Sequence, residues 1–266
     1  MTISRVAIVG VGVMGEGMIK SLVAAGVESS AISIIDKREE RVDELIERYQ
    51  VTGRSIREAD AVILAVKPQD FEKCIEELKD DITSGTLVVS LLAGVKTVRI
   101  ERHISESMRV IRVMPNTPII LGEGMSAITK GKSATDSDLY WVVNFLTNSG
   151  RTLVVEEELM DAVTSVSGSG PAYFYTLVEA MIHSAVRLGL SEQDSTLIVH
   201  QTLIGAAKML NKSGKSAKTL RIDVTSPNGT TEAALKAFED NNLNEIVFQA
   251  LSAAKNRSAE LSRVVS

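Results

Sequence analysis

The hexapeptide GVGVMG at residues 10–15 decides how this chain folds. It follows the apolar run RVAIV at residues 5–9, which predicts a buried strand, and it opens a helical pattern over residues 14–25 that Gly26 closes. In such a strand–turn–helix unit, Gly10 permits the tight turn, Gly12 lets a bound group approach the backbone, and Gly15 lets helix and strand pack closely. The hexapeptide therefore predicts the first unit of a doubly wound sheet.

Strand and helix patterns alternate along the chain beyond this turn. We expect strands at residues 31–35, 61–66, 87–91, 108–113, 122–129 and 152–155, and helices at residues 38–49, 71–78, 95–104 and 137–148. Short loops between alternating strands and helices predict a parallel sheet with helices on both faces.

From about residue 157 the pattern becomes helical. Helices are expected at residues 160–166, 172–188, 191–211 and, as one long element, 230–262. We therefore predict an α/β fold with two domains, a Rossmann doubly wound parallel sheet over residues 1–157 and a C-terminal all-helical domain over residues 158–266. Helices with such apolar faces predict that the second domain pairs with a second copy of the chain as a homodimer.

A dinucleotide is the ligand that this turn predicts. The spacing alone is weak, but the turn lies between strand and helix, and Asp36 stands at the end of the next expected strand. The helix N-terminus beyond Gly12, at Val13 and Met14, presents free N–H groups to a pyrophosphate. A sharp turn without a ligand is the alternative.

The choice between the two nicotinamide cofactors stays open at this point. The Asp36 carboxylate can accept hydrogen bonds from ribose hydroxyls, which favours NADH. Lys37 and Arg38 can clamp a 2′-phosphate, which favours NADPH, or they can be the solvated first turn of a charged helix.

The composition of the chain limits which partners it can bind and in which cellular compartment we expect it. The chain has 266 residues and a formal net charge of −5 without a basic run, which argues against nucleic acid. No apolar run is long enough for a membrane span or a signal core, and the single Cys74 cannot form an internal disulfide. We expect a cytoplasmic protein that acts on a small-molecule substrate. No cluster of His and Cys residues predicts a metal site.

Four motifs in order resemble the pyrroline-5-carboxylate reductase family over nearly the whole chain. They are AVKP at residues 65–68, MPNTP at 114–118, SGSGPAY at 167–173 and TSPNGTT at 225–231. The resemblance implies reduction of the cyclic imine 1-pyrroline-5-carboxylate to L-proline with NADPH or NADH, the last step of proline biosynthesis. It also implies a Rossmann domain followed by an interlocking helical dimer, which in some members assembles into larger rings.

The resemblance also assigns residues to the site. It places along the dinucleotide, in addition to the residues above, Ala65, Val66, Lys67, Pro68, Ala93, Gly94 and Asn116. It places at the substrate Thr225, Gly229, Thr230 and Thr231. From the chemistry of the residues, we expect Thr231 to donate or relay a hydrogen bond to the ring nitrogen, and Ser167 and Gly168 to bring the backbone close to the nicotinamide and the substrate.

Two stretches depart from the family pattern. Asn228 stands where the family usually has Gly, and because Asn tolerates left-handed backbone, we expect the turn to survive. The loop TGRS at residues 52–55 lacks the Asn that the family often has near the adenosine, which adds to the uncertainty between NADH and NADPH.

The residues of TSPNGTT predict a substrate-binding site independently of the resemblance. Pro227, Asn228 and Gly229 form a turn, and the helix that follows presents N–H groups to an anion the size of the substrate carboxylate. Simple capping of that helix by Thr230 or Thr231 is the alternative. For the stretch at residues 167–171, the alternative is a tight helix crossing built from small residues.

Two other functions compete with imine reduction. A β-hydroxyacid dehydrogenase shares the glycine turn, but it carries a lysine four residues after the Gly-x-Gly of the helical domain, where this chain has Phe174. Removing a proton from an alcohol requires such a base. A dinucleotide sensor without turnover is the second alternative, and the complete TSPNGTT stretch argues against it.

Overall fold

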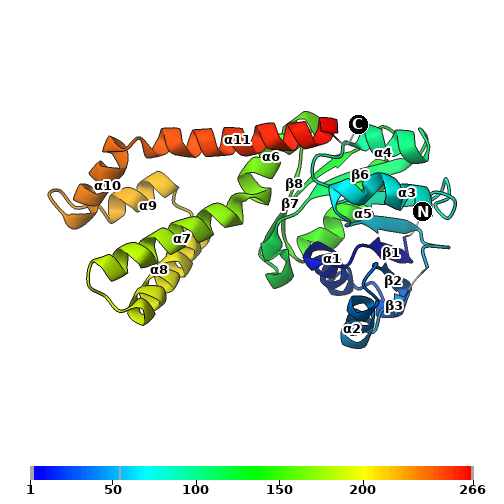
Figure 1. The fold of residues 1–266 in the computed structure, drawn as a ribbon, viewed down its shortest axis with the longest axis horizontal. Coiled ribbons are helices and arrows are strands. Elements are labelled where there is room, and N and C mark those ends of the chain that lie inside the picture. Colours follow the sequence, from blue (N-terminus) through cyan, green and yellow to red (C-terminus); the bar gives the residue numbers. More distant parts are fainter. Residues whose placement is uncertain (1–2, 54, 265–266) are drawn as a thin grey trace. The chain divides into compact units, whose positions relative to one another are not determined.

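The computed structural model describes residues 3–53 and 55–264, and an eight-stranded sheet is its largest feature. The strand order is β3-β2-β1-β4-β5-β6-β7-β8, and each described neighbouring pair is parallel except β6 with β7 (Figure 1). The strands are β1 (Val6–Val9), β2 (Ile32–Ile35), β3 (Thr52–Gly53), β4 (Ala61–Leu64), β5 (Leu87–Ser90), β6 (Arg109–Met114), β7 (Gly124–Lys130) and β8 (Gly150–Val154). The predicted parallel, doubly wound fold is confirmed.

Helices cover both faces of this sheet. On one face α1 (Val13–Ala24), α2 (Glu39–Tyr49) and α5 (Asp136–Thr147) share a core with alternate residues of the strands. On the other face α3 (Phe71–Leu78) and α4 (Thr97–Ile104) do the same. The strands β1 and β4 are apolar throughout, with the sequences VAIV and AVIL, because a parallel strand covered on both faces has no solvent side.

The helices of the second half are α6 (Met160–Val163), α7 (Gly170–Arg187), α8 (Glu192–Lys212), α9 (Ala217–Asp223), α10 (Thr230–Asp240) and α11 (Leu243–Val264). A π-helical turn at Thr164–Gly168 follows α6. The prediction of one helix over residues 230–262 is wrong. Asn241 ends α10, and Asn242 adopts left-handed backbone with φ 54°, so the chain turns before α11 begins.

Two compact units make up the described chain. One comprises residues up to Ser169 together with those from Ala253 onward, and the other comprises Gly170–Ser252. This division falls later than residue 157, where the sequence pattern changes, and the domain boundary between residues 157 and 158 stays a prediction.

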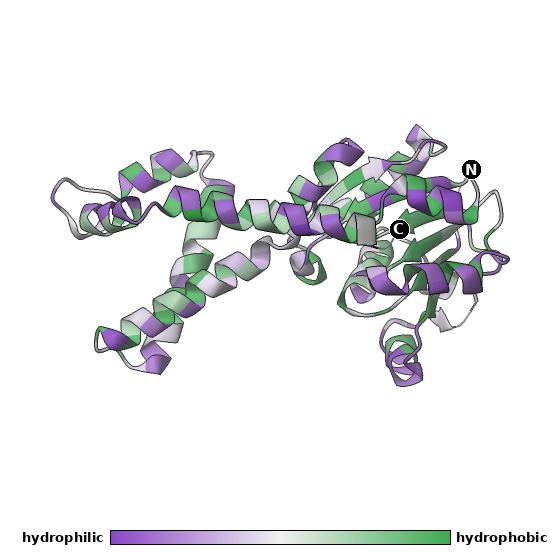
Figure 2. Cartoon of the chain, turned by 45° about the horizontal axis from the view of Figure 1, so that its top comes forward, coloured by the Kyte–Doolittle hydropathy of each residue, from purple (hydrophilic) through white to green (hydrophobic). Residues whose placement is uncertain are grey.

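The second unit buries almost nothing by itself. Of residues 170–252, all of which the structure describes, only Gly170, Ser195 and Val199 are buried. Large apolar side chains stay exposed along its helices, among them Phe174, Leu197 and Phe248, and Figure 2 shows these helices with many hydrophobic residues. Apolar side chains exposed in such number are typical of a protein–protein interface.

Among the described helices, none combines the length and the apolar character that crossing a membrane requires.

Candidate functional site

The glycine turn has the backbone that its sequence predicts. Gly10 adopts φ +89°, and a Cβ there would lie 2.8 Å from the backbone of Ala65 and Val66. A Cβ on Gly15 would collide with the carbonyl oxygen of Gly10. A Cβ on Gly12, by contrast, would meet no heavy atom within 4 Å. Two of the glycines therefore let backbone segments pack, and the third leaves open space at the start of α1.

A pocket of about 530 Å³ opens beside this turn, at the carboxyl ends of β1, β2 and β4. Crevices at the carboxyl ends of parallel strands are where open α/β sheets bind ligands. The N-cap of α1 is Gly12, which has no side chain to occupy the free N–H groups. The pocket and the uncapped helix therefore fit a dinucleotide.

Eight of the predicted cofactor residues line this pocket. They are Gly10, Gly12, Asp36, Lys37, Arg38, Ala65, Val66 and Lys67. The other predicted cofactor residues, namely Val13, Met14, Gly15, Pro68, Ala93, Gly94 and Asn116, are not among its lining residues. Their contact with the cofactor stays a prediction.

Sequence reasoning missed one wall of the pocket. Asp70, Cys74, Glu77 and Leu78 line it from α3 and the turn before it. Cys74, Glu77 and Leu78 follow Asp70 by four, seven and eight residues, which puts all four on one face of a helix. The helical pattern after AVKP could therefore have indicated that this face lines the pocket. Burial raises the pKa of the Cys74 thiol to about 11, which makes this cysteine a wall residue and not a reactive one.

Asp36 is held in place by both the turn and its own loop. Its Oδ2 accepts the Val11 N–H at 2.9 Å, and its Oδ1 accepts the Arg38 N–H at 3.0 Å. The Arg38 guanidinium donates to both oxygens, at 2.9 and 3.0 Å. These hydrogen bonds, that of the Arg38 side chain first, lower the pKa of Asp36 to about 2. Asp36 is therefore ionised at neutral pH.

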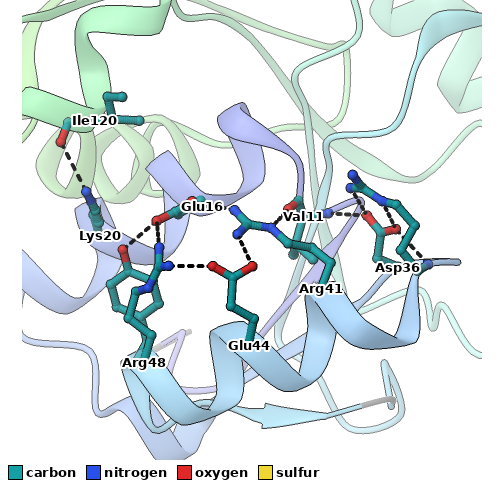
Figure 3. A network of polar contacts seen from close by, with 10 residues as sticks. Val11, Glu16, Lys20, Asp36, Arg41, Glu44, Arg48 and Ile120 are labelled. Carbon is teal, nitrogen blue, oxygen red and sulfur yellow. Dashed lines mark hydrogen bonds and ion pairs between the residues drawn. The ribbon is translucent and has the colours of Figure 1, made fainter.

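An ion-pair network fixes the other side of the turn (Figure 3). Arg41 of α2 donates to the Val11 carbonyl at 3.1 Å and pairs with Glu16 of α1 and with Glu44. Glu16 also accepts from Arg48 at 2.9 Å. Burial alone would raise the pKa of Glu16, but its hydrogen bonds lower it overall. Val11 is thus held at its N–H by Asp36 and at its carbonyl by Arg41, which fixes the turn before any ligand binds.

Asn116 joins three segments at the end of β6. Its Oδ1 accepts the Met125 N–H at 2.8 Å, and its Nδ2 donates to the Ser167 carbonyl at 3.3 Å. Gly168 packs against Met114. The structure therefore brings the MPNTP and SGSG motifs together, and the π-helical turn that carries Ser167 is a form often found at functional sites.

The predicted substrate residues of TSPNGTT lie in the second unit. Asn228 has φ 59°, so the left-handed turn survives the replacement of the usual Gly, as expected. Gly229 is the N-cap residue of α10, and it has no side chain that could accept a hydrogen bond from the first N–H groups. Thr230 and Thr231 lie inside the first helical turn and are not the N-cap residue. The N-cap residue therefore leaves the N–H groups at the start of α10 without a side-chain hydrogen bond.

Two polar groups near that helix start already have partners. Glu232 accepts the Asn228 N–H at 2.8 Å, and the Thr225 hydroxyl donates to the Arg221 carbonyl at 2.6 Å. A hydroxyl that donates in this way keeps its acceptor capacity for a ligand.

Known proteins share this architecture from end to end. Residues 157–261 match the family model described as pyrroline-5-carboxylate reductase dimerisation, and residues 5–94 match the one described as NADP oxidoreductase, coenzyme F420-dependent. The pyrroline-5-carboxylate reductase of Corynebacterium melassecola is 35% identical over 98% of this chain and 99% of its own length. The chain belongs to the pyrroline-5-carboxylate reductase family.

Other members of the family agree with this assignment. Pyrroline-5-carboxylate reductase 1 of Bacillus subtilis is 38% identical over 97% of this chain and 89% of its own length. The pyrroline-5-carboxylate reductase structure of Coxiella burnetii superimposes with a TM-score of 0.90 at 34% identity, covering 98% of this chain and 99% of that one. The Plasmodium falciparum enzyme, solved with NADP bound, gives a TM-score of 0.85 at 26% identity and covers 97% and 98%. The protein is thus an oxidoreductase that uses a nicotinamide dinucleotide.

Proposed function

We propose that the chain reduces 1-pyrroline-5-carboxylate to L-proline with NADPH or NADH, as the last step of proline biosynthesis. The observation that carries the proposal is full-length similarity to pyrroline-5-carboxylate reductases in a chain whose glycine turn borders a pocket of about 530 Å³.

The protein's own part in this reaction is to place the reactants. A bound nicotinamide supplies the hydride. The glycine turn and Asp36 hold the dinucleotide, and the uncapped start of α10 offers N–H groups to the substrate carboxylate. Thr231 is half-buried in the first turn of α10. Its hydroxyl donates or relays a hydrogen bond to the ring nitrogen of the neutral imine, and it accepts the N–H of that nitrogen once the imine is protonated. A protonated imine is already electrophilic, so alignment contributes most of the acceleration.

The rival alcohol dehydrogenation lacks its base. In a β-hydroxyacid dehydrogenase a lysine follows the Gly-x-Gly by four residues, and here Phe174 stands at that position on α7. Phe174 cannot accept a proton, which favours an imine substrate over an alcohol.

Turnover is tested by the loss of cofactor absorbance at 340 nm when 1-pyrroline-5-carboxylate is added, and by identifying proline as the product. Absence of turnover with both NADH and NADPH would refute the proposal. Binding of the cofactor without turnover would support the sensor alternative.

Thr231→Ala is expected to lower kcat/KM at least tenfold, because it removes a hydrogen bond to a charged group worth about 1.5–3 kcal/mol. The free energy of unfolding should fall by no more than about 1 kcal/mol, since the side chain makes no cap in this fold. Thr231→Ser keeps the hydroxyl and is the matched control, which should retain near-normal activity. Equal rates for wild type and Thr231→Ala would remove Thr231 from the site.

For the assembly, we propose a homodimer formed through the helical second unit, with a ring of dimers as a higher level of association. The support is a unit of which only three residues are buried, within a segment that matches a dimerisation family. Light scattering at micromolar concentration should give at least the dimer mass, and a monomer mass would contradict this proposal. We also propose a cytoplasmic location, in keeping with a single cysteine that is buried.

A further inference from the structure

The ribose end of the pocket holds one carboxylate that is fixed and two cations that are exposed. Asp36 has a side chain only 10% exposed, whereas the side chains of Arg38 and Lys37 are 62% and 68% exposed. Ligand binding can move the two cationic side chains at little cost, because exposed ion pairs contribute about 0–1 kcal/mol. Ligand binding cannot displace Asp36, however, without breaking the hydrogen bond that its carboxylate accepts from a backbone N–H group.

That donor belongs to the glycine turn itself. The Asp36 Oδ2 accepts the Val11 N–H at 2.9 Å, and on the other side of the residue Arg41 holds the Val11 carbonyl. Any displacement of Asp36 would leave this N–H without its partner and loosen the turn that cradles the dinucleotide. The carboxylate therefore keeps its position when the pocket fills.

The charges around the pocket balance and leave no cationic excess. The lining residues include three carboxylates, those of Asp36, Asp70 and Glu77, and three cations, those of Lys37, Arg38 and Lys67. Lys37 lies 3.5 Å from Asp70, and Arg38 forms a two-pronged pair with Asp36. A 2′-phosphate would bring nearly two further negative charges next to Asp36. A 2′-hydroxyl would instead donate a hydrogen bond to the same carboxylate.

We propose that this chain uses NADH in preference to NADPH, and that the immobile carboxylate of Asp36 sets the preference. The inference rests on the proposed function only in that the pocket takes a nicotinamide dinucleotide. The cofactor that we propose, NADH, differs from the one named in the family description and in the Plasmodium falciparum structure, which is NADP.

The test is an equilibrium titration of the full-length protein, without substrate, that follows the fluorescence of NADH and of NADPH. NADH should bind at least tenfold more tightly. Equal binding, or tighter binding of NADPH, would overturn the inference while leaving the reductase assignment intact. Failure to bind either cofactor would overturn the proposed function and the inference together.

Asp36→Asn tests the residue itself. The amide keeps the shape and an acceptor for the Val11 N–H but removes the charge, so the ratio of NADPH to NADH dissociation constants should fall at least tenfold. Asp70→Asn is the matched control, because Asp70 lines the same pocket without touching the turn, and it should change the ratio less than threefold.

Two outcomes with these variants would contradict the role of Asp36. An equal shift in Asp70→Asn would assign the preference to the summed charge of the pocket. A selective loss of NADPH binding in Arg38→Gln, larger than the effect of Asp36→Asn, would make Arg38 the determinant and reverse the inference.

Discussion

Replacing Gly15 by alanine is expected to abolish cofactor binding and to destabilise the fold. A Cβ at this position would collide with the carbonyl oxygen of Gly10, and both groups belong to the backbone of one turn. No rotamer change can relieve such a clash, so α1 must move away from β1. We expect the free energy of unfolding to fall by about 3 kcal/mol, at the upper end of what overpacking costs.

Gly12→Ala is the matched variant, and it should separate stability from binding. A Cβ there meets no heavy atom within 4 Å, and the φ of −69° suits any residue. The free energy of unfolding should change by less than about 1 kcal/mol, which is the difference between Gly and Ala at an N-cap. Cofactor affinity should nevertheless fall at least about 100-fold, or 2.7 kcal/mol, because the methyl group takes the space of the pyrophosphate.

Thermal unfolding and NADH titration of both variants provide the measurement. Protein concentration has to be held constant, because association makes the melting temperature depend on it. Normal NADH binding by Gly12→Ala would mean that the pyrophosphate does not cross this part of the turn, and the pocket would then need another ligand.

The sequence was most informative where local chemistry alone determines the structure. The alternation of strands and helices predicted the doubly wound sheet, and the spacing of Gly10 and Gly15 predicted contacts that the structure contains. Asn228 was expected to hold a left-handed turn because its side chain tolerates that backbone, and its φ is 59°. Each of these predictions depends on a few adjacent residues.

The errors arise where distant or short segments decide the outcome. β3 has only two residues and forms because β2 offers an open edge, which no periodicity reveals. Asn241 and Asn242 interrupt an otherwise continuous helical pattern after Asp240, although their residue types favour a helix end. The contacts of Asn116 with Ser167 and Met125 depend on chain segments up to 51 residues apart.

A buried ion pair that no sequence motif indicated ties together the segments that lead to the site. Arg112 of β6 has a side chain only 1% exposed and donates to Glu157, whose other oxygen accepts the Thr97 hydroxyl at 3.0 Å. Two further nitrogens of Arg112 are buried without a hydrogen-bond partner among the described residues. Glu157 is therefore the one counter-charge near this guanidinium that the described ion pairs supply.

The ion pair between Arg112 and Glu157 joins segments that lead into the candidate site. β6 leads directly into the MPNTP motif with Asn116, and Thr97 follows the segment that contains Ala93 and Gly94. Glu157 is the first residue of the segment that matches the dimerisation family. A change in the pair should therefore affect both of these predicted site segments together.

Glu157→Gln is expected to lower the free energy of unfolding by about 3–5 kcal/mol, because it leaves a buried guanidinium without its counter-charge. In a unit of this size, that corresponds to a fall of about 10 °C in the melting temperature. Arg112→Met should cost less, about 2 kcal/mol, because Glu157 is 20% exposed and can regain water once its partner is gone.

The double variant Arg112→Met with Glu157→Gln decides whether the pair is an ion pair or merely two well-packed side chains. If the charges are coupled, Glu157→Gln should add little once the cation is absent, and the double variant should be more stable than Glu157→Gln alone. Such non-additivity, of about 3 kcal/mol, is the signature of residues in direct contact. Strict additivity would instead attribute both losses to packing. Independent effects of that kind would also remove the reason to expect the two site segments to move together when the pair is broken.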